Sequence, residues 1–321
     1  MNRKIKVNFV DFHGDFDKEN NDFMDILRKH YDVEVSEQPD YLFYSVFGHE
    51  FIKYDCVRIF YTGECVVPDF NLCDYAIGFE QMTYGDRYIR VPLYQLFQYK
   101  AALQAAVERS TESSTERAFC SFVCSNDSGM GQRQQIFDLL SQYKKVDSGG
   151  RFLNNIGGPV ADKFEFDKKH KFSIAFENCI AEGYTTEKII QAFAAGTIPI
   201  YLGNPSIAKE INPKAFVNCQ DFSSLQEVVE HVIRIDTDDM LYRKMVQEPV
   251  FIGSPPTLED LERFLLHIVE QPLADARRRP QNNRIQEAES HAKVAAYYET
   301  YIGMPLKHAK GLIRRLKNKA L

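Results

Sequence analysis

Apolar residues in the first third of the chain fall into short runs rather than into helical stripes. Each run holds four to seven residues and is rich in β-branched or aromatic types, which is typical of buried strands in a parallel sheet. The runs are residues 4–10, 41–47, 56–62 and 75–79. Apolar residues at helical spacing predict helices over residues 22–31 and 94–107.

The second half repeats the alternation of strands and helices. Strands are predicted at residues 118–124, 172–176, 198–202 and 215–218, and helices at 133–143, 186–195 and 224–235. Strands that alternate with helices of this length indicate βαβ units. The pattern therefore predicts an α/β protein with two Rossmann-like domains that face each other across a cleft. Ligands of such sheets bind at the carboxyl ends of strands.

Polar and helical segments set the expected domain limits. Residues 109–117 (RSTESSTER) lack large apolar side chains and favour an interdomain linker, with a plain surface loop as the alternative. Beyond residue 255 the pattern turns helical, with helices expected at 257–270 and 284–301. We expect an N-terminal domain over 1–110, a second domain over 111–270 and a helical tail over 271–321.

The tail ends in a basic stretch. Residues 306–321 hold six Lys or Arg and no acidic residue, with Leu312, Ile313 and Leu316 on one flank. That composition suits peripheral contact with an anionic membrane surface, and a solvated terminal helix is the alternative.

Net charge and cysteine content indicate that the chain is neither a nucleic-acid-binding protein nor a disulfide-rich one. The net charge of −6 gives no indication of nucleic-acid binding. The seven cysteines are odd in number, form no C-x-x-C and lie mostly in apolar runs, so free thiols in a reducing compartment are expected. Because neither a signal peptide nor a span of about 18 apolar residues is visible, we expect a cytoplasmic protein, with or without contact at the inner membrane face.

The densest cluster of chemistry lies in residues 171–203, KFSIAFENCIAEGYTTEKIIQAFAAGTIPIYLG. A strand ends at Glu177 and a loop with Gly183 follows, after which Thr185 or Thr186 can cap a helix. A helix N-terminus binds anions. A cation such as Lys188 in the first turn is unfavourable for the helix dipole, so its presence there favours a bound diphosphate. The alternative is a capped surface helix with an incidental ion pair.

Three segments carry a resemblance to a known family. They are FEN…GYTTEKIIQAFAAGTIPIYLGNPSIAKEINPKAFVN; RIFYTGE with Pro68-Asp69 and DYAIGF; and SFVCSN with Arg133 downstream. Together they span about residues 56–222 and resemble the α-1,3/4-fucosyltransferases of glycosyltransferase family 10, in particular the bacterial members that build Lewis-type antigens. The resemblance implies the GT-B architecture, with an N-terminal acceptor domain and a C-terminal donor domain.

The resemblance implies inverting transfer of fucose from GDP-fucose. The acceptor is then the 3-hydroxyl of GlcNAc in N-acetyllactosamine-type glycans, which gives a Lewis X-like product. Inversion needs one carboxylate base, and the matched motif places it at Glu64. Phe12 and His13 follow the first strand, where the bacterial relatives carry an aromatic pair, so they are the expected acceptor contacts.

The donor residues are assigned by the same resemblance. Arg133 and Lys188 meet the negative charge that grows on the leaving diphosphate. Glu187 holds the ribose hydroxyls. The remaining expected donor contacts are Asn178 and Tyr184 at the nucleotide, and Glu177 near the fucose or the diphosphate.

No required metal or cofactor is expected. The two D-x-D matches, Asp15–Asp17 and Asp236–Asp238, are weak, and two cations can neutralise the diphosphate without a metal. No nucleic-acid partner is expected, and the sequence leaves the oligomeric state open. Two alternatives also remain open: a GT-B transferase for another nucleotide sugar, and a non-catalytic nucleotide-binding or membrane scaffold.

Overall fold

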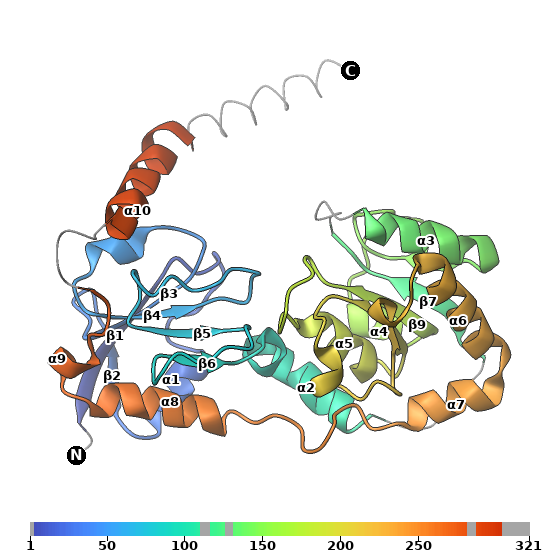
Figure 1. The fold of residues 1–321 in the computed structure, drawn as a ribbon, viewed down its shortest axis with the longest axis horizontal. Coiled ribbons are helices and arrows are strands. Elements are labelled where there is room, and N and C mark those ends of the chain that lie inside the picture. The colour runs from blue at the N-terminus through green and yellow to red at the C-terminus, as the bar shows by residue number, and fades with distance from the viewer. Residues whose placement is uncertain (1–2, 110–115, 126–130, 281–286, 304–321) are drawn as a thin grey trace. The chain divides into compact units, whose positions relative to one another are not determined.

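A computed structural model describes residues 3–109, 116–125, 131–280 and 287–303. The described chain divides into two compact units, drawn in Figure 1. Unit 1 holds residues 1–78, 82–89 and 259–321, and unit 2 holds residues 79–81 and 90–258. Residues 110–115 of the expected linker, Asn126 and the whole basic stretch 306–321 lie outside the described residues.

Unit 1 is built on a six-stranded sheet in the order β2-β1-β3-β4-β5-β6. The pairs among β1 to β5 are parallel. The strands are β1 (Lys4–Val10), β2 (Asp32–Val35), β3 (Tyr41–Tyr44), β4 (Val57–Tyr61), β5 (Tyr75–Gly78) and β6 (Tyr88–Arg90). The predicted strands of this half are confirmed, whereas the short β2 and β6 were not predicted because they lack a long apolar run.

The helices of unit 1 come from both ends of the chain. They are α1 (Asp22–Arg28), α8 (Glu259–Glu270), α9 (Leu273–Ala276) and α10 (Glu287–Tyr298). Helix α8 packs against α1, and its Leu261, Leu265 and Ile268 are buried. Arg3 and Tyr41 donate hydrogen bonds to the carbonyl of Val269 at the end of this helix.

Unit 2 is built on a five-stranded sheet in the order β11-β10-β9-β7-β8, in which every pair is parallel. The strands are β7 (Ala118–Phe122), β8 (Val146–Ser148), β9 (His170–Phe176), β10 (Ile198–Leu202) and β11 (Val217–Asn218). The helices are α2 (Lys100–Val107), α3 (Gln132–Tyr143), α4 (Lys163–Asp167), α5 (Glu187–Ala194), α6 (Leu225–Thr237) and α7 (Asp239–Gln247).

Both faces of the second sheet are covered, which explains why β9 is buried along its whole length. Phe172, Ile174 and Phe176 pack into one cluster with side chains of α3, α6 and α7. Ala175, between them, belongs to the cluster on the other face with α2 and α5. The strand therefore places Glu177, the polar residue that follows it, at the margin of a fully packed core.

The units do not follow the expected domain limits at residues 110 and 270. Helix α2 belongs to unit 2 because it packs on α5, and α8 belongs to unit 1 because it packs on α1. The helix predicted over 94–107 is also shorter, since two 3₁₀ turns, Leu93–Gln95 and Phe97–Tyr99, precede α2. Local periodicity did not indicate which sheet each helix would cover.

The cysteine expectation holds in part. Cys56, Cys73, Cys120 and Cys219 are free and buried, and Cys124 is partly exposed. Cys65 and Cys179 are disulfide-bonded, contrary to the expectation of free thiols. Among the described residues, no helix has the length and apolar content needed to cross a bilayer.

Candidate functional site

The expected donor residues of unit 2 gather where β9 ends and α5 and α3 begin. Arg133, in the first turn of α3, donates one hydrogen bond to the carbonyl of Phe176 (2.8 Å) and one to Oδ1 of Asn178 (2.9 Å). It is almost fully buried, whereas Asn178 is exposed. The guanidinium thus ties the start of α3 to the residues that directly follow β9.

Glu177 and Lys188 form a buried ion pair. Nζ of Lys188 lies 3.0 Å from Oε2 of Glu177 and donates to the hydroxyl of Thr186 at 2.9 Å. Oε1 of Glu177 accepts from the backbone N–H of Thr186 (2.7 Å), and Oε2 also accepts from the Thr186 hydroxyl (2.6 Å). Glu177 is only 1% exposed, while the Lys188 side chain keeps 23% of its surface accessible.

Electrostatics keep Lys188 charged. Burial alone would lower its pKa, but the carboxylates of Glu177 and Glu187 outweigh burial, so the pKa of Lys188 lies above its ordinary value. Burial raises the pKa of Glu177, and the cation beside it opposes that rise. The sequence explained a Lys at this helix terminus by a bound anion; the structure adds Glu177 as an internal counter-charge.

The first turn of α5 lacks the expected side-chain cap. Thr186 occupies the N-cap position, but no side-chain hydrogen bond caps the helix, because the Thr186 hydroxyl is directed to Glu177. Glu187 begins the helix and lies 3.7 Å from Nζ of Lys188. A helix N-terminus without a side-chain cap presents backbone N–H groups and the positive end of the helix dipole, which suits an anion.

Glycines make room for the buried pair and its loop. A Cβ at Gly203, just after β10, would lie 2.4 Å from Cγ of Glu177, so any larger residue would displace that carboxylate. Gly183 has a φ of +81°, and a Cβ there would lie 2.3 Å from the carbonyl oxygen of Phe79. Tyr184 is buried next to it, with its ring edge-on to Phe79 at 5.0 Å.

A second polar network supports the same loop, and sequence reasoning missed it. Glu210 accepts hydrogen bonds from Arg90 (2.8 Å), Tyr94 (3.2 Å) and Thr185 (3.2 Å). Arg90 also donates to the carbonyls of Phe79 (2.8 Å) and Gly183 (2.9 Å).

The buried Asn204 completes this network. Its side chain accepts from the N–H of Gly183 at 2.7 Å and donates to Thr185 and Glu210. The only sequence signal for the network was that Asn204 follows a strand in the matched segment. Nothing local connected Arg90 to Glu210, which are 120 residues apart.

The expected residues of unit 1 lie at the carboxyl ends of its strands. Phe12 and His13 follow β1, and Glu64 follows β4 in an exposed turn in which its N–H donates to the Thr62 hydroxyl at 2.9 Å. The rings of Phe12 and Tyr61 stack with centroids 6.0 Å apart, which connects the loop after β1 to the end of β4.

Neither D-x-D match is arranged for a metal. Asp17 accepts from the backbone of Glu19 and Asn20, and Asp238 caps α7. Asp236 is paired with Lys144 and Lys171. No group of three or more His, Cys, Asp or Glu side chains within the described residues is placed to hold a metal ion.

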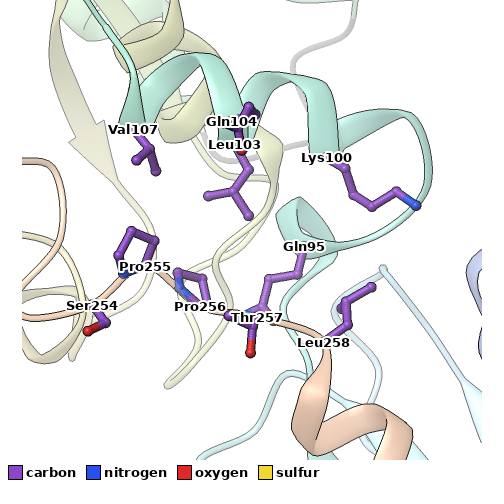
Figure 2. Close-up of a pocket in the computed structure, with 10 residues that line it drawn as sticks. All are labelled: Gln95, Lys100, Leu103, Gln104, Val107, Ser254, Pro255, Pro256, Thr257 and Leu258. Carbon is purple, nitrogen blue, oxygen red and sulfur yellow. The ribbon is translucent and has the colours of Figure 1, made fainter.

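A separate pocket of about 520 Å³ lies between α2 and residues 254–258 (Figure 2). Leu103 and Val107 of α2 and the two prolines Pro255 and Pro256 give it an apolar lining, with Lys100 at its margin. None of the expected site residues lines it. The pocket is therefore distinct from the cluster around Lys188.

Two sequence models of one family match most of the chain. The model described as "Alpha-(1,3)-fucosyltransferase FucT N-terminal domain" matches residues 7–97. The model described as "Glycosyltransferase family 10 (fucosyltransferase) C-term" matches residues 113–247.

Individual relatives agree with the models. The α-(1,3)-fucosyltransferase FucT of Helicobacter pylori is 34% identical over 262 residues, which cover 70% of this chain and 55% of that protein. The human GDP-fucose protein O-fucosyltransferase 3 is 34% identical over 119 residues, which cover 34% of this chain and 25% of the relative. The chain thus spans about half or less of the length of these curated relatives.

Solved structures extend the likeness to the fold. A crystal structure of an α1,3-fucosyltransferase with GDP-fucose matches with a TM-score of 0.72 and 29% identity, covering 84% of this chain and 92% of that one. The structure of an α1,3-fucosyltransferase with GDP matches with a TM-score of 0.73 and 29% identity, covering 87% and 94%. The expected GT-B type of fold, with two Rossmann-like domains, is confirmed by this likeness. With both family models matched in order along the sequence and the fold shared with solved α1,3-fucosyltransferases, the chain belongs to glycosyltransferase family 10.

Proposed function

We propose that this chain transfers L-fucose from GDP-fucose, with inversion, to the 3-hydroxyl of GlcNAc in N-acetyllactosamine-type acceptors. The family supports the reaction class, and the names of the relatives support GDP-fucose as donor and α-1,3 linkage. The observation that carries the proposal is the pair of cations, Arg133 and Lys188, beside the uncapped start of α5.

The reaction needs little from the protein beyond charge and position. The acceptor oxygen attacks C1 of fucose while the bond from C1 to the diphosphate oxygen breaks, and its electron pair leaves with GDP. The acceptor proton passes to a carboxylate, which we assign to Glu64 because it is exposed at the end of β4. Lys188 and Arg133 stabilise the negative charge that develops on the leaving diphosphate.

Of the other expected donor residues, we assign some to direct contact with the nucleotide and others to holding the loop and Lys188 in place. Glu187 and the exposed Asn178 are assigned to the nucleotide, as the family resemblance implies. Tyr184 is buried against Phe79, so we assign it to shaping the loop floor beside the nucleotide. Both oxygens of Glu177 are engaged by Thr186 and Lys188, so we assign it to holding Lys188 rather than to touching the sugar.

We further propose that no metal is required, because Arg133 and Lys188 supply the positive charge that a divalent ion would otherwise provide. Turnover should then persist in excess chelator.

For location we propose the cytoplasm, with the basic stretch 306–321 at the inner membrane face; deleting it should move the protein from membrane to soluble fractions.

The first test is Glu64→Gln, which keeps the shape of the side chain and removes the base. We expect turnover to fall by about 10²–10⁴-fold while the affinity for GDP stays unchanged. Glu34→Gln, at an exposed position on β2, is the matched control and should behave as wild type. Unchanged turnover in Glu64→Gln would remove this residue from the mechanism.

The second test is Lys188→Ala. Loss of a charged hydrogen-bond donor should weaken GDP binding by about 10–100-fold and slow turnover as well. Lys209→Ala removes an exposed cation of the same unit and should change neither quantity. Calorimetric titration with GDP measures the difference, and equal affinities for the two variants would discard the diphosphate assignment.

A further inference from the structure

Three loops meet at one edge of the sheet of unit 1. Strands β1, β3 and β4 are parallel neighbours, so the residues that follow them share that edge. The loop after β1 carries His13, the loop after β3 carries Phe47, and the loop after β4 carries Glu64. Phe47 was not among the residues expected from the sequence.

Phe47 is a large apolar side chain that the fold leaves in water. It is 55% exposed, whereas the aromatic residues of β3 just before it are buried. Its ring meets that of His13 edge-on, with centroids 6.5 Å apart. His13 is exposed as well and meets Phe16 edge-on at 6.2 Å. An exposed aromatic pair at the ligand edge of an α/β sheet is the kind of surface that marks a binding site.

Asp11 holds this pair in place. Its carbonyl accepts from the N–H of Phe47 at 2.9 Å. Its carboxylate accepts from the N–H groups of Glu50 (2.8 Å) and Phe51 (2.9 Å). The loop before His13 and the loop that carries Phe47 are therefore joined at a single residue.

The backbone at Asp11 has an unusual conformation. Its φ is +62°, a value that residues other than glycine seldom adopt. Backbone strain of this kind is concentrated at functional positions. Gly48 is required beside it, since a Cβ there would lie 2.3 Å from Oδ1 of Asp11. A strained residue, Asp11, and a glycine that fits beside it, Gly48, therefore lie next to the backbone of Phe47.

We propose that Phe47 and His13 form an aromatic platform on which the acceptor saccharide stacks, and that Asp11 is the positioning residue for this platform. The apolar C–H face of a pyranose matches the face of an aromatic ring, while the sugar hydroxyls stay in water. The inference rests on the proposed function for the identity of the ligand, an oligosaccharide with an N-acetyllactosamine end.

Kinetics give the first test. Phe47→Ala should raise the KM for N-acetyllactosamine by about tenfold or more and leave the KM for GDP-fucose unchanged. Phe47→Tyr keeps the ring and should restore the acceptor KM. Phe164→Ala is the matched control, since Phe164 is 41% exposed on α4 of unit 2. An unchanged acceptor KM in Phe47→Ala would overturn the platform.

Asp11→Asn tests the positioning role. Asparagine tolerates this backbone conformation, but its amide can accept at only one of the two positions used by the carboxylate. The acceptor KM should rise while the KM for GDP-fucose and the melting temperature stay close to those of wild type. An unchanged acceptor KM would remove Asp11 from the proposal.

Fluorescence gives a test that does not depend on turnover. The chain contains no tryptophan, so Phe47→Trp introduces its single indole. Titration with N-acetyllactosamine should change the emission saturably, and Phe164→Trp should not respond. A silent Phe47→Trp in a chain that still transfers fucose would refute the platform alone. A saturable response in a chain that transfers no fucose would uphold the platform and refute the proposed function.

Discussion

At the scale of single residues, an opposite charge nearby keeps a buried titratable group ionised. Lys188 remains a cation in a largely buried position because Glu177 lies 3.0 Å away, and Glu177 is held by Thr186. Unpaired, either charge would be costly to bury. The same rule governs Asp236 on the far side of unit 2, whose carboxylate accepts from Lys144, Lys171 and Tyr143.

Asp236 leads to a prediction about pH. Burial raises the pKa of this carboxyl, but hydrogen bonds from Lys144, Lys171 and Tyr143, together with the positive charge of Lys171, outweigh burial and leave the pKa below its ordinary value. The folded state therefore binds fewer protons than the unfolded state, and the pair stabilises the fold above about pH 4. This contribution is lost as the pH falls through the lowered pKa.

The substitution Asp236→Asn measures the effect. At neutral pH it should lower the free energy of unfolding by about 3 kcal/mol, because it leaves two cations without their carboxylate. The difference from wild type should shrink as the pH falls below about 4, where wild type loses the same contribution. Denaturant unfolding from pH 7 to pH 3 tests this, and a difference that stays constant with pH would contradict it.

At the scale of elements, the loop between β9 and α5 is fixed by side chains distant in sequence. Gly183 and Thr185 have no regular secondary structure, yet Arg90, Asn204 and Glu210 bond to them. Loops normally vary in position, so a loop that carries a site needs such anchors. The network holds the backbone that leads into Thr186 and Lys188.

Removing Glu210 should loosen that loop. In Glu210→Ala, Arg90 and Asn204 lose an acceptor, and we expect about 2 kcal/mol less stability together with faster amide exchange at residues 180–186. The KM for GDP-fucose should rise more than kcat falls. Glu182→Ala, at an exposed position of the same loop, is the control. Unchanged exchange at 180–186 would show that the loop does not depend on Glu210.

At the scale of the whole molecule, unit 1 is built from three stretches of the chain, residues 1–78, 82–89 and 259–321. After unit 2 is complete at Leu258, α8 returns to unit 1 and buries Leu261, Leu265 and Ile268 against it. Arg3 and Tyr41 donate hydrogen bonds to the end of this helix, and Arg279 bonds to the buried Asp74 just before β5. The packing of unit 1 is therefore complete only when the segment that begins at residue 259 is present.

Truncation tests this dependence. A chain that ends at Leu258 should leave apolar surface of unit 1 exposed, and we expect it to aggregate or to bind a hydrophobic dye. A chain that ends at residue 303 keeps α8 to α10 and should retain the melting temperature of wild type. Light scattering and thermal unfolding compare the two. A monomeric, cooperatively melting 1–258 fragment would contradict the dependence on α8.

The sequence alone determined the strand–helix alternation, the parallel α/β class and the position of the polar cluster around Lys188, because hydrophobic period and residue spacing are local properties. Glu177, Thr186 and Lys188 lie within twelve residues, so one segment contains the strand end, the loop and the helix start. The four predicted strands of that half recur as β7, β9, β10 and β11 with limits shifted by no more than a few residues.

Only the tertiary structure decided which elements belong together. It assigned α2 to the second sheet and α8 to the first, buried Glu177 beneath its loop, joined Arg90 to Glu210 and left Phe47 in water. Each of these facts depends on partners that are distant along the chain, and local periodicity carries no signal for a distant partner. The burial of a polar residue or the exposure of an apolar one is fixed only when the whole chain has packed.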